Sequence, residues 1–337
     1  MKKRVVMTGT LGVMNEASIA MIKGFVEERA DVEFEFLFDA PQTGEDEKKL
    51  IEAAKGAEVL ITQYQFMTES LYDALLPELK AVIAYGVGYN SANLPVATEK
   101  GVYVINVPDY CMEEVALHVV TLILAMVRRI PNLERWVREG NWGGGYKAMA
   151  PVKRFSTSTV GIYGYGRIGQ YVGKFLSGFG CRIIAFDAVI PDEDIRKAGA
   201  EPVDFDTLLA ESDILTLQVP LIPQTARQFT LDVFKKMKPS AIFVNTSRGA
   251  LTIPDDLYTA LTTGEIAYAA IDAYETEPPQ GIEEKIKELP NVLSTPHVGY
   301  YSDDALVELM VKTAEEAARV VKGERPKNLV NKTLWKD

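Results

Sequence analysis

Three polar side chains in the last third of the sequence, Arg248, Glu277 and His297, have the types needed to bind an acid and move a proton. An arginine holds a carboxylate with two parallel hydrogen bonds, and a histidine exchanges a proton with an oxygen atom near neutral pH. A glutamate beside that histidine would orient the imidazole and stabilise its protonated form. Taken singly, the three residues could instead be a surface ion pair, a turn residue and a helix cap.

The placement of these residues along the chain favours a shared site. Each of them follows a short apolar run that is typical of a buried β-strand. These runs are 241–245, 268–271 and 292–294. Asp272 comes directly after the second run. In a doubly wound sheet the carboxyl ends of the strands line the ligand crevice. We therefore expect Arg248, Glu277 and His297 to meet at one edge of such a sheet.

A glycine-rich loop earlier in the chain predicts a dinucleotide site. The apolar run 160–163 leads into Gly164, Gly166 and Gly169 in the spacing GxGxxG, and a helical pattern follows. Such glycines allow a tight turn, a close approach of a pyrophosphate, and close packing of helix on strand. Asp187 ends the next predicted strand, 18 residues after Gly169, where it would accept hydrogen bonds from ribose hydroxyls. No arginine is adjacent, so NAD is favoured over NADP. A plain glycine turn with a surface aspartate is the alternative.

The rest of the sequence alternates short apolar runs with amphipathic segments, the pattern of βαβ units and a parallel sheet. The predicted strands form two series, 4–7, 33–37, 59–61, 81–84 and 102–105, then 159–163, 182–186, 214–218, 241–245, 268–271 and 292–294. A single long helix over 111–138 is expected between the series, and another over 303–322. The sequence therefore predicts an α/β protein with two doubly wound parallel-sheet domains.

Composition limits the classes of protein to which the chain can belong. Its 337 residues suffice for about two domains, and a formal net charge of -11 disfavours binding to nucleic acid or to an anionic membrane. Two distant cysteines and no cluster of metal ligands predict neither a disulfide framework nor a metal site. No export signal or membrane span is recognisable, so the cytoplasm is the expected location. His118 lies in an apolar helix, where packing or an internal hydrogen bond is expected.

These segments resemble the D-isomer-specific 2-hydroxyacid dehydrogenase family, in the branch of D-lactate and D-2-hydroxyisocaproate dehydrogenases and C-terminal-binding proteins. The motifs that carry the resemblance are Asn-Thr-Ser-Arg-Gly at 245–249, Glu-Pro at 277–278 and Thr-Pro-His-Val-Gly at 295–299. The resemblance implies that Arg248, Glu277 and His297 are catalytic. The loop 86–94 is similar to the family's substrate loop, and its backbone amides around Val87 and Gly88 would hold the substrate carboxylate.

The resemblance also implies a split architecture and a cofactor. Residues 1–106 and 299–337 would form a flavodoxin-like substrate domain, and residues 107–298 a Rossmann domain inserted into it. NAD would be bound by Gly164, Tyr165, Gly166, Arg167, Ile168, Gly169, Asp187, Val219, Pro220, Thr225, Thr246, Ser247 and Asp272. Asp272 would lie near the carboxamide. Members of the family are commonly dimers joined through their cofactor domains, so a homodimer is expected.

The implied reaction is reduction of a 2-oxo acid to the D-2-hydroxy acid with hydride from NADH. Arg248 would clamp the carboxylate and His297 would donate the proton. Two alternatives stay open on the same fold. One is an NAD-sensing scaffold similar to the C-terminal-binding proteins, and the other is a phosphite- or phosphoglycerate-type dehydrogenase.

The side chain of the substrate is less closely defined. Tyr64 and Tyr300, with Phe66 and Tyr301, would line an apolar pocket suited to pyruvate-like or bulkier oxo acids, or would merely pack at the hinge. Phosphoglycerate dehydrogenases tend to carry an arginine in the loop after the third strand, and the segment 61–68 has no basic residue. The sequence therefore predicts a small 2-oxo or 2-hydroxy acid without a phosphate group.

Overall fold

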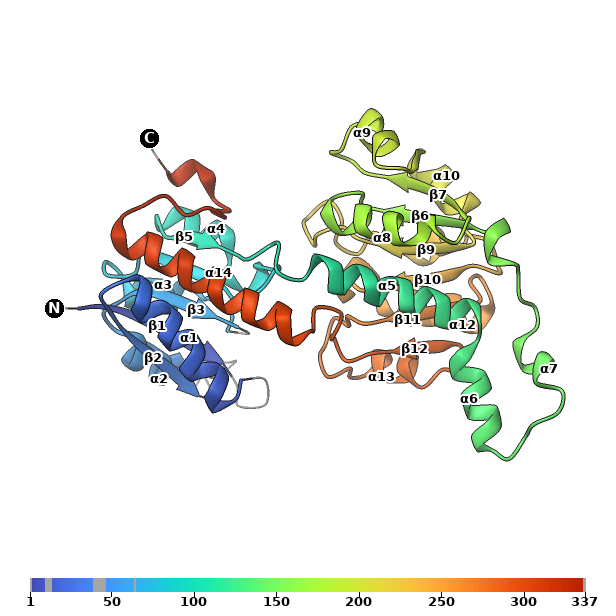
Figure 1. Ribbon diagram of the computed structural model, residues 1–337, viewed down its shortest axis with the longest axis horizontal. Coiled ribbons are helices and arrows are strands. Elements are labelled where there is room, and N and C mark those ends of the chain that lie inside the picture. The colour runs from blue at the N-terminus through green and yellow to red at the C-terminus, as the bar shows by residue number, and fades with distance from the viewer. Residues whose placement is uncertain (1, 10–13, 39–46, 64, 336–337) are drawn as a thin grey trace. The chain divides into compact units, whose positions relative to one another are not determined.

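The structure, a computed structural model, describes residues 2–9, 14–38, 47–63 and 65–335 (Figure 1). Its contacts divide the chain into two compact units. Unit 1 comprises Met1–Cys111 and Ser302–Asp337, and unit 2 comprises Met112–Tyr301. Each unit has its own parallel sheet with helices on both faces, so the predicted α/β class is confirmed. These units are defined by contacts alone, so the predicted domain boundaries at 106/107 and 298/299 stay a prediction.

Unit 1 is built on a five-stranded sheet in the order β2-β1-β3-β4-β5, with every pair of strands parallel. Its elements are β1 (Lys3–Gly9), α1 (Glu16–Arg29), β2 (Val32–Phe38), α2 (Glu47–Ala54), β3 (Ala57–Thr62), α3 (Glu69–Leu75), β4 (Ala81–Ala84), η2 (Asn90–Ala92), α4 (Leu94–Glu99), β5 (Tyr103–Ile105), α14 (Asp303–Lys322) and η5 (Lys332–Leu334). This strand order is that of flavodoxin-like folds.

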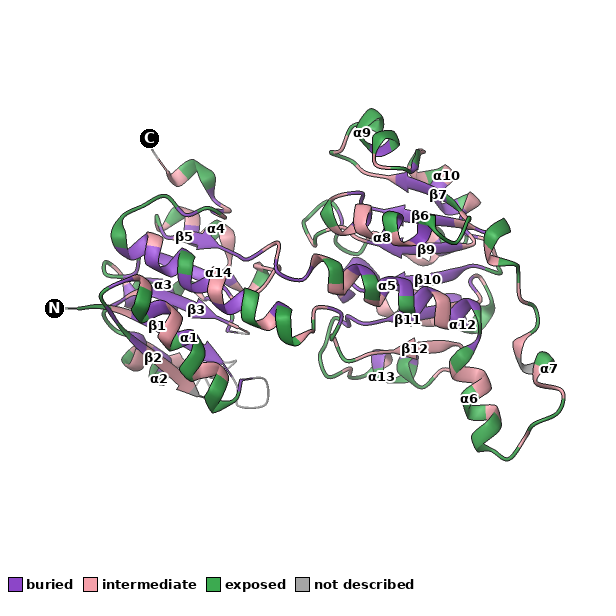
Figure 2. Ribbon diagram, in the orientation of Figure 1, coloured by how far each residue is buried: buried purple, intermediate pink, exposed green. Residues whose placement is uncertain are grey.

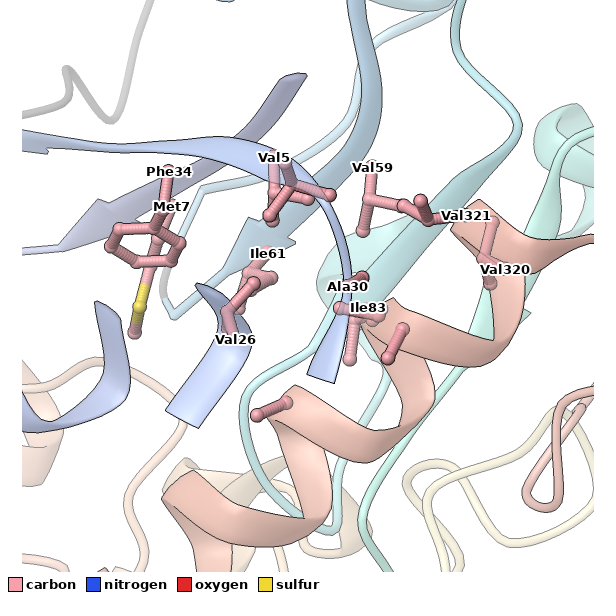
Figure 3. Close-up of a cluster of buried hydrophobic side chains, with 14 of the residues drawn as sticks. Val5, Met7, Val26, Ala30, Phe34, Val59, Ile61, Ile83, Val320 and Val321 are labelled. Carbon is pink, nitrogen blue, oxygen red and sulfur yellow. The ribbon is translucent and has the colours of Figure 1, made fainter. Parts of the chain in front are cut away.

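Alternate residues of the unit 1 strands pack on opposite faces of the sheet. Val5 and Met7 of β1 face α1 and α14, where Val26 and Val321 lie in the same cluster (Figure 3). Val6 faces the other way, into a second cluster with α2, α3 and α4. A sheet that is buried on both faces needs continuous apolar strands, which explains the apolar runs of β1, β3 and β4. The edge strand β2 instead alternates, with Glu33 exposed between the buried Val32 and Phe34.

Unit 2 is built on a seven-stranded parallel sheet in the order β12-β11-β10-β9-β6-β7-β8. Its elements are α5 (Met112–Val127), α6 (Ile130–Arg138), α7 (Gly145–Met149), η3 (Phe155–Thr157), β6 (Thr159–Tyr163), α8 (Arg167–Ser177), β7 (Arg182–Phe186), α9 (Asp192–Lys197), β8 (Glu201–Pro202), α10 (Phe205–Glu211), β9 (Ile214–Leu217), α11 (Leu231–Phe234), β10 (Ile242–Asn245), η4 (Gly249–Leu251), α12 (Pro254–Thr263), β11 (Tyr268–Ile271), α13 (Ile282–Lys287) and β12 (Val292–Ser294).

The strand order of unit 2 reverses between β6 and β9. Helices α5 and α8 cover one face of the sheet, and α10 to α13 cover the other. The chain leaves β6 toward β7 on one side and reaches β9 on the other, so the loops after β6 and β9 diverge. Such a switch point opens a crevice at the carboxyl ends of the strands, which is where the predicted site residues lie.

The predicted strands are all present, with bounds that differ by at most two residues from those expected. The prediction of one helix over 111–138 is wrong, because α5 ends at Val127 and α6 begins at Ile130. Arg129 between them has a positive φ of 54°, a left-handed conformation that no helix interior adopts. The short strand β8 was not expected. Among the described residues, no helix has both the length and the apolar character needed to cross a membrane.

Candidate functional site

The glycine-rich loop lies between β6 and the N-terminus of α8. Its three glycines are required for different reasons. A Cβ atom added to Gly164 would lie 2.6 Å from a backbone oxygen of Gln218, and φ there is +94°. A Cβ atom on Gly169 would lie 2.2 Å from the Gly164 carbonyl oxygen. A Cβ atom on Gly166 would meet no atom within 4 Å. Internal packing therefore explains Gly164 and Gly169, whereas Gly166 leaves open space at a helix N-terminus, where phosphates bind.

The side chain of Tyr165, in the same loop, points into the protein. It is fully buried, and its hydroxyl donates to the Ala198 carbonyl oxygen at 3.2 Å. Its backbone N–H donates to the Asp187 carboxylate at 2.8 Å. Only the backbone of Tyr165 is therefore available to a dinucleotide. Arg167 is exposed and Ile168 is half-buried, and both lie in the first turn of α8.

Asp187 follows β7 at the same edge of the sheet. Besides the Tyr165 amide, its carboxylate accepts from the amides of Val189 at 2.8 Å and Ile190 at 2.9 Å. A carboxylate has about four lone-pair positions, so one remains after these three bonds. The position and remaining capacity of Asp187 fit the predicted contact with ribose.

The other residues predicted to bind the dinucleotide follow β9 and β10. Val219 and Pro220 lie just after β9, and the hydroxyl of Thr225 closes their loop by donating to the Pro220 carbonyl oxygen at 2.6 Å. Thr246 and Ser247 directly follow β10. The loops after β6, β7, β9 and β10 therefore lie at the carboxyl edge of one parallel sheet, as does the open space at Gly166. These donors and this space fit a dinucleotide.

Arg248 lies in a tight turn that its neighbours shape. The buried Asn245 at the end of β10 donates from its amide to the Arg248 carbonyl oxygen at 2.9 Å and accepts from the Ser247 N–H at 3.1 Å. The half-buried guanidinium of Arg248 donates to the Ser247 carbonyl oxygen at 2.6 Å. This turn presents a fixed planar cation at the carboxyl edge of the sheet, which is the arrangement needed to bind a carboxylate.

Glu277 and His297 form a direct pair. The Nδ1 atom of His297 lies 2.8 and 2.9 Å from the two carboxylate oxygens of Glu277, and each side chain is 38% exposed. Because a carboxylate can only accept, Nδ1 carries the hydrogen and Nε2 is the nitrogen that can exchange a proton with a ligand. The structure therefore brings together two of the three side chains that the sequence predicts to be catalytic.

The backbone of His297 adopts the left-handed conformation, with φ +53°. A residue other than glycine pays for that conformation, so the surrounding contacts must hold it. Its N–H donates to the Asp272 carbonyl oxygen at 2.9 Å. The Asp272 carboxylate accepts from the next two amides, those of Val298 at 3.1 Å and Gly299 at 3.0 Å. Asp272 thus fixes the turn that sets the orientation of the His297 imidazole ring.

The carboxylate of Asp272 belongs to a buried network. The Thr295 hydroxyl donates to it at 2.5 Å, and the Nε2 atom of His118 lies 3.1 Å from that hydroxyl and 3.4 Å from the carboxylate. Burial by itself would raise the pKa of Asp272. Hydrogen bonds from His118 and Thr295, with two from backbone amides, outweigh it and lower the pKa to about 2. The internal hydrogen bond expected for His118 is present.

The residues predicted to bind substrate are distributed between the units. Val87 and Gly88 are half-buried in the loop after β4 of unit 1, where the Val87 carbonyl oxygen accepts from the Asn106 amide at 2.6 Å. Tyr300 of unit 2 meets the ring of His297 edge-on, with 6.4 Å between centroids. Tyr64 lies outside the described residues. In the described part of the chain, no group of three histidine, cysteine or acidic side chains is arranged to hold a metal ion.

One residue of this region escaped the sequence analysis. Glu283 of α13 is buried, and its carboxylate accepts from the amides of Glu275 and Thr276, directly before Glu277. The segment 282–287 alternates glutamate and lysine with isoleucine, a pattern that predicts a solvated helix face. No local signal in the sequence distinguishes Glu283 from its exposed neighbour Glu284.

Comparison with known proteins supports the geometry. The family model described as "D-isomer specific 2-hydroxyacid dehydrogenase, NAD binding domain" matches residues 120–299. A glyoxylate reductase of Thermococcus litoralis is 37% identical over 292 residues, which cover 85% of this chain and 87% of that protein. A D-3-phosphoglycerate dehydrogenase of Archaeoglobus fulgidus is 33% identical over 290 residues, which cover 86% of this chain but 54% of that protein.

A solved structure extends the likeness to almost the whole chain. The crystal structure of D-lactate dehydrogenase from Aquifex aeolicus, complexed with NAD and lactic acid, is similar to this structure with a TM-score of 0.86. It is 25% identical in sequence, and the likeness covers 99% of this chain and 100% of the other. The matched region therefore includes the glycine-rich loop and all three motifs around Arg248, Glu277 and His297.

Proposed function

The chain belongs to the D-isomer-specific 2-hydroxyacid dehydrogenase family, and from that premise we propose that it reduces a small 2-oxo acid to the D-2-hydroxy acid with NADH. NAD is the cofactor of the family, and the enzyme is an NAD-dependent oxidoreductase. The observation that carries the proposal is the His297–Glu277 pair at the carboxyl edge of the sheet that bears the dinucleotide loop.

Each of the three polar side chains has one task in the proposed reaction. The guanidinium of Arg248 binds the substrate carboxylate, and its positive charge stabilises negative charge that develops on the neighbouring carbonyl oxygen. His297 donates a proton to that oxygen from Nε2. Glu277 accepts the Nδ1 hydrogen, which keeps the ring oriented and favours its protonated form. The amides around Val87 and Gly88 stay a proposed second contact of the carboxylate.

The reaction balances with one hydride and one proton. When bound, NADH supplies the hydride that adds to C2 of the oxo acid. His297 supplies the proton to the oxygen on C2, so that the carbonyl becomes a secondary alcohol, and the imidazole then regains a proton from solvent. In the opposite direction His297 is the base that accepts the hydroxyl proton. The chain's part is therefore to orient the acid and to hold or release one proton.

The relatives support a substrate with a small, uncharged side chain. They also include the main alternative, a phosphoglycerate dehydrogenase. Proteins named glyoxylate reductase from Thermococcus litoralis and Korarchaeum cryptofilum are 37% and 34% identical to the chain. Proteins named D-3-phosphoglycerate dehydrogenase reach 35% identity, but the chain spans 54% of the length of that relative. The segment 61–68 contains no lysine or arginine to hold a phosphate group. We therefore favour glyoxylate or pyruvate over phosphohydroxypyruvate.

A panel of oxo acids tests the proposed reaction. NADH oxidation is measured with glyoxylate, pyruvate, 2-oxoisocaproate, phenylpyruvate, hydroxypyruvate and phosphohydroxypyruvate, and the product is resolved on a chiral column. We expect rapid turnover of glyoxylate or pyruvate and a D product wherever C2 becomes chiral. Preference for phosphohydroxypyruvate would establish the phosphoglycerate-type alternative. NADH binding without turnover of any acid would favour the scaffold alternative, and NAD reduction by phosphite would establish phosphite oxidation.

Variants of the site test the roles within it. We expect Arg248→Ala and His297→Ala each to lower kcat/KM by at least about 100-fold. NADH binding, followed by fluorescence, should persist in both variants. The control is Arg196→Ala, which removes an exposed arginine of α9. Turnover like that of the unaltered chain in either site variant would refute the role assigned to that residue.

A further inference from the structure

The segment 273–277, which follows β11 and ends at Glu277, is held by two sets of contacts. The first set comes from Gly249, which directly follows Arg248. A Cβ atom added to Gly249 would lie 2.0 Å from the Glu275 nitrogen and 2.1 Å from the Tyr274 carbonyl carbon. The turn that carries Arg248 therefore packs, backbone against backbone, on the segment that leads to Glu277.

The second set of contacts comes from Glu283. Its side chain belongs to a residue that is only 6% exposed, and one carboxylate oxygen accepts from the Glu275 N–H at 2.7 Å. The other oxygen accepts from the Thr276 N–H at 2.9 Å. A carboxylate that is withdrawn from water needs such charge-assisted bonds to offset its desolvation. These two bonds fix two consecutive peptide groups immediately before Glu277.

The direction of the Glu277 side chain depends on that backbone. Its Oε1 atom accepts from the Tyr274 N–H at 3.1 Å while the same carboxylate contacts Nδ1 of His297. A shift of the peptides at 275 and 276 would move Glu277 relative to both partners. A misplacement of about 1 Å at a catalytic group can cost about 100-fold in rate.

We propose that Glu283 is a positioning residue, whose buried carboxylate anchors the backbone at 275–276 and thereby sets Glu277 against His297. The inference rests on the proposed roles of Glu277 and His297. It assigns no contact with substrate or cofactor to Glu283. A glutamine at 283 could not replace the glutamate, because its NH₂ group would face a backbone N–H, and two donors cannot pair.

The test is a double-mutant cycle in the full-length enzyme, with Glu283→Gln and Glu277→Gln. We expect Glu283→Gln alone to lower kcat for the best oxo acid by about 10- to 100-fold, with the KM for NADH unchanged. In the Glu277→Gln background the same substitution should change kcat by less than about 2-fold, since the group that it positions is gone. An equal loss in both backgrounds would show a general structural role and overturn the proposal.

Two further variants serve as a matched control and as a charge-retaining substitution. Glu284→Gln makes the same chemical change at the exposed neighbour on α13, and it should leave kcat unaltered. Glu283→Asp keeps the charge on a shorter side chain and should recover part of the activity. If Glu283→Gln does not fold, Glu283→Asp takes its place in the cycle, and an equal loss in both backgrounds again overturns the proposal.

A readout without substrate separates this inference from the proposed function. Amide hydrogen exchange at Glu275 and Thr276 should accelerate in Glu283→Gln but not in Glu284→Gln. Unchanged exchange would overturn the anchoring role whatever the activity shows. Conversely, accelerated exchange together with full activity of Glu277→Gln would leave the anchor in place and refute the catalytic role of Glu277.

Discussion

At the scale of single residues, the glycines of the dinucleotide loop show how the same residue type serves packing at one position and a ligand at another. Gly169 is needed because a Cβ atom there would lie 2.2 Å from the Gly164 carbonyl oxygen, whereas the space next to Gly166 is open. The distinction predicts opposite outcomes for the same substitution at two positions three residues apart. The sequence motif alone assigns both glycines to one function, and only the distances separate them.

We predict that Gly166→Ala leaves the fold intact and weakens NADH binding, because the new methyl group occupies space that the pyrophosphate needs. Gly169→Ala should instead lower the free energy of unfolding by about 2 kcal/mol or more, because its Cβ would lie 2.2 Å from a backbone oxygen. Urea unfolding and NADH fluorescence titration measure the two effects. A Gly166→Ala variant that binds NADH like the unaltered chain would contradict the assignment of the open space.

The lowered pKa of Asp272 predicts that the stability of the fold depends on pH. This pKa is about 2 in the folded chain against 3.8 ordinarily, so the folded state favours the ionised carboxylate. The depressed pKa therefore contributes stability that is present above about pH 4 and is lost as the pH falls toward 2, by about 2 kcal/mol in total. Urea unfolding of the chain and of Asp272→Asn should show a difference that shrinks over this window. The same difference at pH 6 and pH 2.5 would exclude Asp272 as the titrating group, and Asp304→Asn on the surface is the control.

At the scale of elements, the strands were predictable and the break in the long helix was missed. Both sheets are buried on their two faces, so their central strands are short apolar runs that the sequence shows directly. The residues at 111–138 continue a helical pattern, but α5 ends at Val127. The sequence carries a local signal for this break, because Pro131 lies in the first turn of α6 and a proline disrupts a helix interior. A tertiary contact accompanies the break: the Arg129 guanidinium lies 3.5 Å from the centre of the Tyr268 ring.

The residues of the candidate site also divide into those that the sequence predicts and those that it does not. The meeting of Glu277 and His297 was predictable because each follows a strand of one parallel sheet, at the same edge. The residues that orient them were not. The contact of Asp272 with the cofactor stays a prediction, but no pattern in the sequence indicates that its carboxylate accepts from the turn that holds His297. The role of Glu283 depends on a turn of the chain that brings α13 back to the segment before Glu277, which no spacing in the sequence specifies.

The break between α5 and α6 predicts a large effect of a single buried arginine. Besides the contact with Tyr268, the Arg129 guanidinium donates to the Met126 carbonyl oxygen at 2.6 Å. Arg129→Ala removes both contacts, and we expect it to lower the free energy of unfolding by about 2 to 3 kcal/mol. Arg128→Ala, at the exposed neighbour, should change it by less than about 0.5 kcal/mol. Thermal and urea unfolding measure both, and equal effects would contradict the structural role of Arg129.

At the scale of the whole molecule, α6 exposes several of its apolar side chains to solvent. Ile130, Leu133 and Val137 recur at the spacing of one helix face, yet no residue of α6 is fully buried (Figure 2). Trp142 is 85% exposed and Tyr146 in α7 is 71% exposed. A cluster of large apolar side chains in water is uncommon on a monomer and typical of a surface that another chain covers. The homodimer expected for the family would supply that chain.

We predict that the protein is a homodimer in which this surface of α6 and the following loop is buried. Light scattering at micromolar concentration should give a mass of about twice the 37.3 kDa of one chain. Val137→Lys combined with Trp142→Ser should weaken the dimer by about 30-fold or more, because a buried tryptophan commonly dominates the energy of an interface. Val307→Lys adds the same charge at an exposed apolar residue of α14 in the other unit, and should leave the mass unchanged. A monomer at these concentrations would contradict the prediction.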